Sequence, residues 1–225
     1  MHLQSTRFNI STMNKSLILM LFFIFLPINI CLAQQNYLYR QSKLSSNLIT
    51  KITQDSVGYI WIGTENGLNK FDGWNYTHYF RNDEDSMSLS GNYIETFLTD
   101  SDETLWIGCN RGLHIYSTYE DNFHKIKFPN NIHPSIKDII QLRNKEIWVV
   151  TAGYGIFSID KENLTATSIH RINNLLDQPY AIHIFQDRNL QIWIALSDNR
   201  IARISANGKE VEIYKIPIEP KRKIQ

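Results

Sequence analysis

Short apolar runs separated by turn residues recur along this chain at a nearly constant spacing. Residues 55–73 read DSVGYIWIGTENGLNKFDG, and similar segments begin at Asp100, Leu142 and Asp187. One tryptophan anchors each copy, and consecutive tryptophans are 45, 42 and 45 residues apart: Trp61, Trp106, Trp148 and Trp193. Runs rich in β-branched and aromatic residues are typical of strands, and a repeat of this length made only of strands is typical of a β-propeller. We therefore predict an all-β chain of four four-stranded antiparallel blades, at about residues 46–80, 91–128, 134–172 and 180–216.

The strand pattern also predicts how the blades are covered. In residues 59–64 (YIWIGT) large apolar side chains point to both faces, so both faces must be buried, as they are in a blade between two other blades. A further alternating run at residues 36–41 is predicted to form a stray outer strand. A closed ring of four blades does not need this strand, so we expect the blades to be part of a larger propeller.

Turn residues recur at equivalent positions in the copies. Aspartate at the first position of a turn can accept hydrogen bonds from its own backbone, glycine supplies unusual backbone conformations, and tryptophan at a strand centre packs between blades. We predict a structural role for the repeated residues Asp55, Trp61, Gly63, Gly67, Asp100, Trp106, Gly108, Gly112, Trp148, Asp187 and Trp193.

Residues 1–33 have the three parts of a secretory signal peptide. A basic start is followed by an apolar stretch, and small residues precede a cleavage position after Ala33. The apolar stretch is shorter than the ~20 residues of a membrane span, so we expect cleavage, no retained membrane segment and a periplasmic mature protein; a retained anchor is the alternative. Removal of the leader removes Cys31, so Cys109 has no disulfide partner, and we predict a small buried side chain.

Charge and motifs exclude several functions. The chain has 23 basic and 22 acidic residues, and without Arg7 and Lys15 of the leader the balance is 21 to 22, or −1. No basic field is available for nucleic acid. Histidines at metal-ligand spacing, nucleophile elbows and phosphate-binding loops are all missing from the sequence, so we predict no catalytic residues, no metal and no cofactor.

The segments DSVGYIWIGTENGLNKFDG and YFRNDEDSMSLSGNYIETFLTDSDETLWIGCNRGLHIY resemble the two-component regulator propeller repeat. The resemblance covers about residues 36–216. It implies a seven-bladed propeller from the periplasmic sensor region of a hybrid two-component system histidine kinase, of which this chain is an N-terminal fragment. The remaining propeller and kinase regions would then be found only in a full-length relative, and this chain would be truncated.

The resemblance implies that the propeller binds a ligand, and we expect an oligosaccharide. The polar turns between the second and third strands of the blades offer amide, carboxylate, guanidinium and aromatic groups suited to hydroxyl-rich ligands. The candidate binding residues are Glu65, Asn66, Asn110, Arg111, Tyr154, Asp198, Asn199 and Arg200.

Two other functions remain open. One is a self-standing propeller scaffold for protein interactions. The other is a polysaccharide-active propeller enzyme, for which Glu95, Glu103 and Glu146 are weak candidates because paired carboxylates would have to face one cavity. Residues 81–91 (RNDEDSMSLSG) are predicted to be a solvated connection between blades rather than an acidic metal site.

Overall fold

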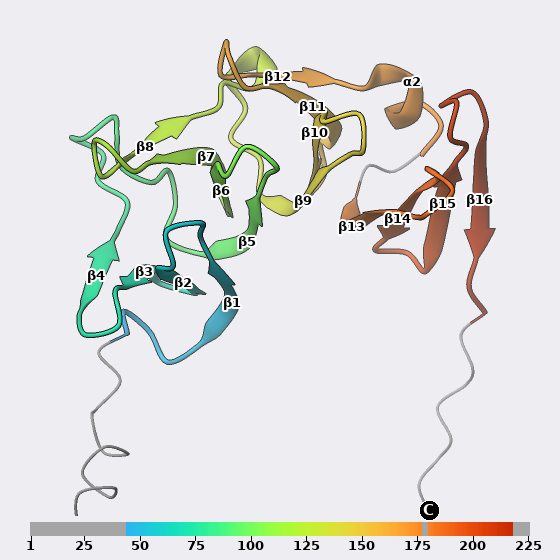
Figure 1. The fold of residues 1–225 in the computed structure, drawn as a ribbon. Coiled ribbons are helices and arrows are strands. Elements are labelled where there is room, and N and C mark those ends of the chain that lie inside the picture. The colour runs from blue at the N-terminus through green and yellow to red at the C-terminus, as the bar shows by residue number, and fades with distance from the viewer. Residues whose placement is uncertain (1–43, 177–179, 218–225) are drawn as a thin grey trace, which may run out of the picture. The chain divides into compact units, whose positions relative to one another are not determined.

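The computed structural model of the chain describes residues 44–176 and 180–217 (Figure 1). Within these residues the chain forms four antiparallel sheets of four strands each, which confirms the predicted all-β propeller blades. The predicted signal peptide at 1–33 and stray strand at 36–41 lie outside the described residues. No helix in the described part of the chain has the length and apolar character of a membrane span.

The strands of each sheet follow one another in sequence order, so each sheet is a meander. The first sheet contains β1 (Ile49–Gln54), β2 (Ile60–Thr64), β3 (Gly67–Phe71) and β4 (Tyr76–Tyr79). The second contains β5 (Ile94–Thr99), β6 (Leu105–Cys109), β7 (Gly112–Ser117) and β8 (Asn122–Lys125). The third contains β9 (Ile136–Gln141), β10 (Ile147–Thr151), β11 (Gly155–Asp160) and β12 (Thr165–Ser168). The fourth contains β13 (Ala181–Gln186), β14 (Ile192–Leu196), β15 (Arg200–Ile204) and β16 (Val211–Lys215).

Short irregular elements join the sheets. A 3-10 turn (Pro129–Asn131) lies between β8 and β9, and the one-turn helix α2 (His170–Asn173) lies between β12 and β13. Beyond β8 the chain pairs with the next sheet, because the Lys127 amide donates to the Leu164 carbonyl and the Ala166 amide donates to the Lys127 carbonyl. The connection therefore ties the outer strands of two sheets together.

The repeated aspartate closes the turn between the first two strands of a sheet and also holds the tryptophan. Oδ1 of Asp100 accepts the backbone amides of Asp102 and Thr104, both at 2.9 Å. Its Oδ2 accepts the indole Nε1–H of Trp106 at 2.9 Å. The same indole bond joins Trp61 to Asp55 (2.7 Å) and Trp193 to Asp187 (2.9 Å).

The hydrophobic core lies in three clusters, each shared by consecutive sheets. Trp61 of the first sheet packs with Ile94 and Phe97 of the second, and Trp106 of the second packs with Ile136 and Ile139 of the third. A third cluster joins the last two sheets. Buried Cys109 belongs to the first cluster, so the prediction of a small buried side chain is confirmed.

Glycine sets the spacing between the first three sheets. A Cβ atom at Gly63 would lie 2.7 Å from Cγ2 of Ile94, and one at Gly108 would lie 2.8 Å from Cγ2 of Ile136. Carbon atoms in contact prefer 3.5–4.0 Å. The two glycines therefore let the first strand of one sheet approach the second strand of the preceding sheet.

Candidate functional site

The turn between the second and third strands of a sheet lies at the same end as the connection to the next sheet, because antiparallel strands reverse direction at each turn. Asn92 makes two hydrogen bonds that hold the connection between β4 and β5 against the β2–β3 turn, and a third that joins the two ends of the connection. Its carbonyl accepts the Gly67 amide at 2.7 Å and its side-chain Oδ1 accepts the Arg81 amide at 2.7 Å. Its Nδ2 donates to Oδ1 of Asn66 at 3.2 Å.

The same connection also packs tightly on the β6–β7 turn. A Cβ atom at Gly91 would lie 2.1 Å from Oδ1 of Asn110 and 3.3 Å from Cβ of Arg111. The Asn110 amide donates to the Tyr93 carbonyl at 2.9 Å. A side chain at position 91 would therefore displace the Asn110 side-chain amide and press on Arg111.

The connection has its own internal support. Arg81 makes a two-pronged ion pair with Asp83, with Nε–Oδ1 and Nη2–Oδ2 distances of 2.7 and 3.0 Å. The Ser88 hydroxyl donates to the Asn82 carbonyl at 2.7 Å. Leu89 is buried in the core and anchors the segment. A long polar connection is thereby supported by contacts of its own residues.

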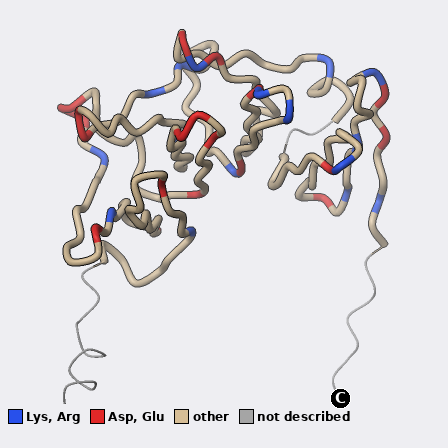
Figure 2. The backbone as a smooth tube through the Cα atoms, in the orientation of Figure 1, with Lys and Arg blue, Asp and Glu red and all other residues tan. Residues whose placement is uncertain are grey.

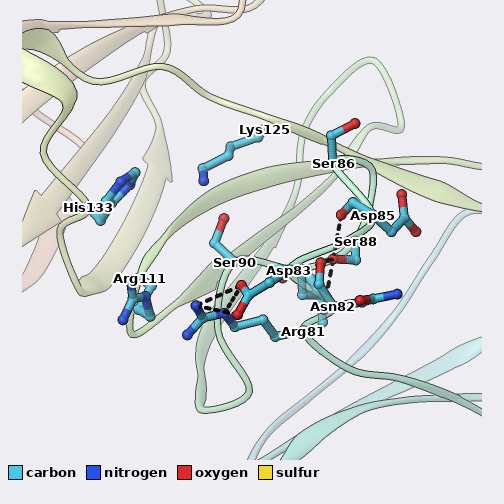
Figure 3. Close-up of a pocket in the computed structure, with 11 residues that line it drawn as sticks. Arg81, Asn82, Asp83, Asp85, Ser86, Ser88, Ser90, Arg111, Lys125 and His133 are labelled. Atoms are coloured by element: carbon cyan, nitrogen blue, oxygen red, sulfur yellow. Dashed lines mark hydrogen bonds and ion pairs between the residues drawn. The ribbon is translucent and has the colours of Figure 1, made fainter.

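These contacts leave a hollow of about 260 Å³, which we call the connection pocket (Figure 3). The connection contributes one wall, the β6–β7 turn contributes Arg111, the end of β8 contributes Lys125, and the segment before β9 contributes His133. In Figure 3 Arg111 and His133 lie on one side of this pocket and Asp85 on the opposite side. Residues far apart in the sequence thus surround one polar cavity.

Positive charge prevails on the side of His133. Its partial burial and the neighbouring charges of Lys125, Arg111 and Arg81 lower the pKa of His133 below its usual value. Asp83 is paired with Arg81, and Oδ1 of Asp85 accepts the Met87 amide at 2.9 Å. Within the described residues, neither Arg111 nor Lys125 has a carboxylate partner within 4.0 Å.

Beneath the pocket, His114 supports Ser90. The Ser90 amide donates to Nε2 of His114 at 3.0 Å, and the Ser90 hydroxyl lies 2.9 Å from the same nitrogen. Complete burial and the charge of Lys125 lower the pKa of His114 to about 3, so the ring is neutral at physiological pH. His114 therefore adds no positive charge to the pocket.

Of the eight predicted binding residues, Arg111 lines the connection pocket. Asn66 is linked to the pocket through Asn92 and Arg81, as described above. The others lie at their own turns, where Glu65 accepts the Ser46 hydroxyl at 3.2 Å and Arg200 is paired with Asp198 at 2.6 Å.

The remaining three predicted residues occupy different turns. Asn110 abuts Gly91, Tyr154 is half exposed in the β10–β11 turn, and the Asn199 carbonyl accepts the Ile216 amide at 2.8 Å. Lys125 and His133 were not predicted, because both lie outside the repeated core. Lys125 ends β8 of the second sheet, and His133 reaches the pocket from the segment before β9.

The carboxylates considered for catalysis have other partners. Glu95 pairs with Lys137 at 2.6 Å, and Glu146 accepts the indole Nε1–H of Trp148 at 3.0 Å. Glu103 lies in the turn before β6 with a left-handed backbone (φ 65°). In the described ranges, no three His, Cys, Asp or Glu side chains are grouped closely enough to hold a metal ion. Figure 2 shows acidic and basic residues interspersed along the described chain.

A family model for the two component regulator propeller matches residues 43–66 and 88–111. The second match contains Gly91, Asn110 and Arg111, so part of the connection pocket is built from the repeat itself. A curated protein, histidine kinase P4 of Formosa agariphila, is 39% identical over 72 residues, which are 30% of this chain and 5% of that protein.

Solved structures share the fold. The extracellular domain of BT3049 from B. thetaiotaomicron, described as a hybrid two component system, has a TM-score of 0.68 and 25% identity, over 76% of this chain and 25% of that one. The extracellular domain of BT4673 from the same organism has a TM-score of 0.66 and 23% identity, over 76% of this chain and 25% of that one. Virginiamycin B lyase from Staphylococcus aureus has a TM-score of 0.56 and 20% identity, over 76% of this chain and 56% of that one.

The chain spans a quarter of the length of the two extracellular domains. The lyase shows that propellers of this kind also occur in enzymes, and at 20% identity it is evidence of fold alone. The resemblance predicted from the repeat is confirmed in the two matched segments. Residues 43–66 and 88–111 match the two component regulator propeller, in a chain whose blades share the fold of the extracellular domain of a hybrid two component system.

Proposed function

We propose that the chain is the ligand-sensing propeller portion of a periplasmic hybrid two-component sensor, that its ligand is an oligosaccharide, and that it catalyses no reaction. The observation that carries the proposal is the match of the regulator propeller repeat in a chain that folds like the extracellular domains of two-component systems. The polar connection pocket beside the matched β6–β7 turn supplies a place for a polar ligand. In the sensor, the signalling output would come from kinase regions of a full-length protein.

Ligand binding by the purified chain tests this proposal. We expect isothermal titration calorimetry against a panel of neutral and acidic oligosaccharides to give saturable binding for at least one class. Asn66→Ala should weaken it, because Asn66 supports the connection through Asn92. Asn189→Ala is the matched control, since this exposed residue lies in the β13–β14 turn at the other end of a sheet.

The negative result is equally informative. A chain that shows a cooperative unfolding transition and binds no oligosaccharide of any class would refute the sensing proposal. The proposal that the chain catalyses no reaction is tested with a panel of polysaccharides. It would be refuted if the chain released new reducing ends or unsaturated products and one carboxylate substitution abolished their release.

A further inference from the structure

The connection pocket is lined by two cations, Arg111 and Lys125, that have no carboxylate partner within 4.0 Å among the described residues. Lys125 comes from the end of β8, and Arg111 is exposed in a turn whose backbone is fixed by the Asn110–Tyr93 hydrogen bond. A guanidinium presents planar pairs of N–H donors that match a carboxylate or sulfate group. An ammonium group nearby adds a second, flexible donor of the same sign.

The charged groups facing the pocket divide into two sets. Arg81 is neutralised by Asp83, with which it makes two hydrogen bonds. Asp85 lies at the far side from Arg111 and His133 (Figure 3). Arg111 and Lys125 thus form a local positive site on the side of the pocket where His133 lies. Desolvation is the largest cause of the lowered pKa of His133, and the charges of Lys125, Arg111 and Arg81 lower it further.

The dimensions limit the occupant. Pockets for drug-sized molecules enclose about 300–1,000 Å³, and the connection pocket encloses about 260 Å³. It is therefore suited to one charged sugar unit at the end or side of a longer chain. The β6–β7 turn lines the pocket through Arg111, and the rest of an oligosaccharide held there would contact the neighbouring polar residues.

We propose that the connection pocket binds the anionic group of an acidic oligosaccharide, a uronate carboxylate or a sulfate ester, through Arg111 and Lys125 with His133 at its edge. This inference rests on the proposed function for the oligosaccharide, whereas the anion site rests on the geometry of the pocket. The two are separated by using small anions and neutral sugars as independent probes.

The first experiment follows His133 by NMR in the full chain at constant ionic strength. Its imidazole signals, assigned with His133→Gln, are titrated with sodium sulfate, sodium glucuronate and, as a control, sodium chloride. We expect sulfate and glucuronate to raise the pKa of His133 saturably, because a bound anion stabilises the imidazolium. Chloride should leave the pKa unchanged.

The second experiment measures affinity for sulfated, uronate-containing and neutral oligosaccharides of equal length. The acidic ligands should bind, and Arg111→Gln or Lys125→Gln should each weaken binding about tenfold or more. Lys127→Gln is the matched control, because Lys127 is exposed, lies two residues from Lys125 and does not line the pocket. Sulfated and uronate ligands are compared to tell which anion the pocket prefers.

The outcomes separate the two proposals. Equal binding of neutral and acidic oligosaccharides that is unaffected by Arg111→Gln would overturn the anion inference and leave oligosaccharide sensing intact. A His133 response to sulfate without binding of any oligosaccharide would uphold the anion site and overturn its glycan ligand. Absence of both responses in the folded chain would overturn both.

Discussion

Gly108 of β6 and Ile136 of β9 form a size-matched pair between the second and third sheets. A Cβ atom at position 108 would lie 2.8 Å from Cγ2 of Ile136 and 2.8 Å from Cγ2 of Thr96. Both distances are well inside the 3.5–4.0 Å optimum for carbon contacts. The interface between the third and fourth sheets uses the opposite arrangement, because Val150 stands at the glycine position and Ala181 at the isoleucine position, both fully buried in one cluster.

We predict that Gly108→Val destabilises the chain and that Ile136→Ala partly compensates. Overpacking costs about 1–3 kcal/mol, and valine should reach the upper end because its Cβ meets two neighbours and carries two further methyl groups. Ile136→Ala alone should cost about 2–5 kcal/mol through the cavity it leaves. In the double variant the valine occupies part of that cavity, so the cost should be about 1–3 kcal/mol less than the sum.

Urea unfolding of the four proteins measures this coupling. With an m-value of roughly 2 kcal/mol/M, a loss of 2 kcal/mol lowers the midpoint by about 1 M urea. Val150→Gly with Ala181→Ile is the reciprocal test in the next interface and should show coupling of the same sign. Costs that add to within about 0.5 kcal/mol at both interfaces would refute the idea that these pairs set the spacing of the sheets.

Further predictions concern single residues. Asp100→Asn should lower the free energy of unfolding at neutral pH by about 1–3 kcal/mol, because Trp106 and Lys161 both donate to Oδ2 of Asp100. Burial alone would raise the pKa of Asp100, but the hydrogen bond from Trp106, the Thr104 amide and the lysine outweigh it and lower the pKa below 3.8. This stabilisation is therefore present above pH 3.8 and is lost as the pH falls through the folded-state pKa. The urea midpoints of variant and parent should converge in acid. A difference between the midpoints that does not change with pH would contradict the role given to the Asp100 carboxylate. Leu190 has a left-handed backbone (φ 65°) where the first repeat has Gly58. Leu190→Gly should therefore stabilise the folded chain by about 0.5–1 kcal/mol and raise its Tm. An unchanged Tm would count against backbone strain at this position. Burial raises the pKa of Cys109 to about 11, so its thiol should react with Ellman's reagent only after unfolding; rapid reaction of the native chain would show that the site is open.

The sequence was sufficient to predict the blades, because each repeat carries its own strand and turn pattern. The tryptophan period predicted four sheets, and these are present. The hydrogen bond from the indole to the aspartate six residues earlier was not predicted, although the constant spacing of Asp55 to Trp61 and Asp100 to Trp106 contained that signal. A strand pattern shows which face a side chain occupies, whereas the partner of its polar edge depends on the conformation of the turn.

The candidate site was less predictable, because it depends on contacts between repeats. Arg111 could be proposed from its place in a polar turn. Lys125 and His133 could not, since one ends a strand and the other lies in an irregular segment, and neither position recurs in the other copies. Gly91 carried a weak signal as an isolated glycine near the end of a polar connection. The close approach at this position becomes apparent only when the Asn110 side chain is placed against it.

The third repeat shows that the repeated turn has two separate parts, its backbone hydrogen bonds and its bond to the indole. Leu142 replaces the aspartate, yet its amide still donates to the Glu146 carbonyl at 2.9 Å and its carbonyl still accepts the Lys145 amide at 2.8 Å. The backbone of the turn therefore forms without the carboxylate, and Lys145 keeps the left-handed conformation found at this position in the other copies. What the aspartate adds is a fixed partner for the indole, and here Glu146 takes that place by accepting from Trp148. A pocket of about 420 Å³ lies beside this altered contact and is lined by Leu142, Glu146 and Trp148. Backbone hydrogen bonds thus preserve the blade while the side chains at its edge are free to change, which explains why the sequence signal weakens along the chain although the four sheets keep one topology.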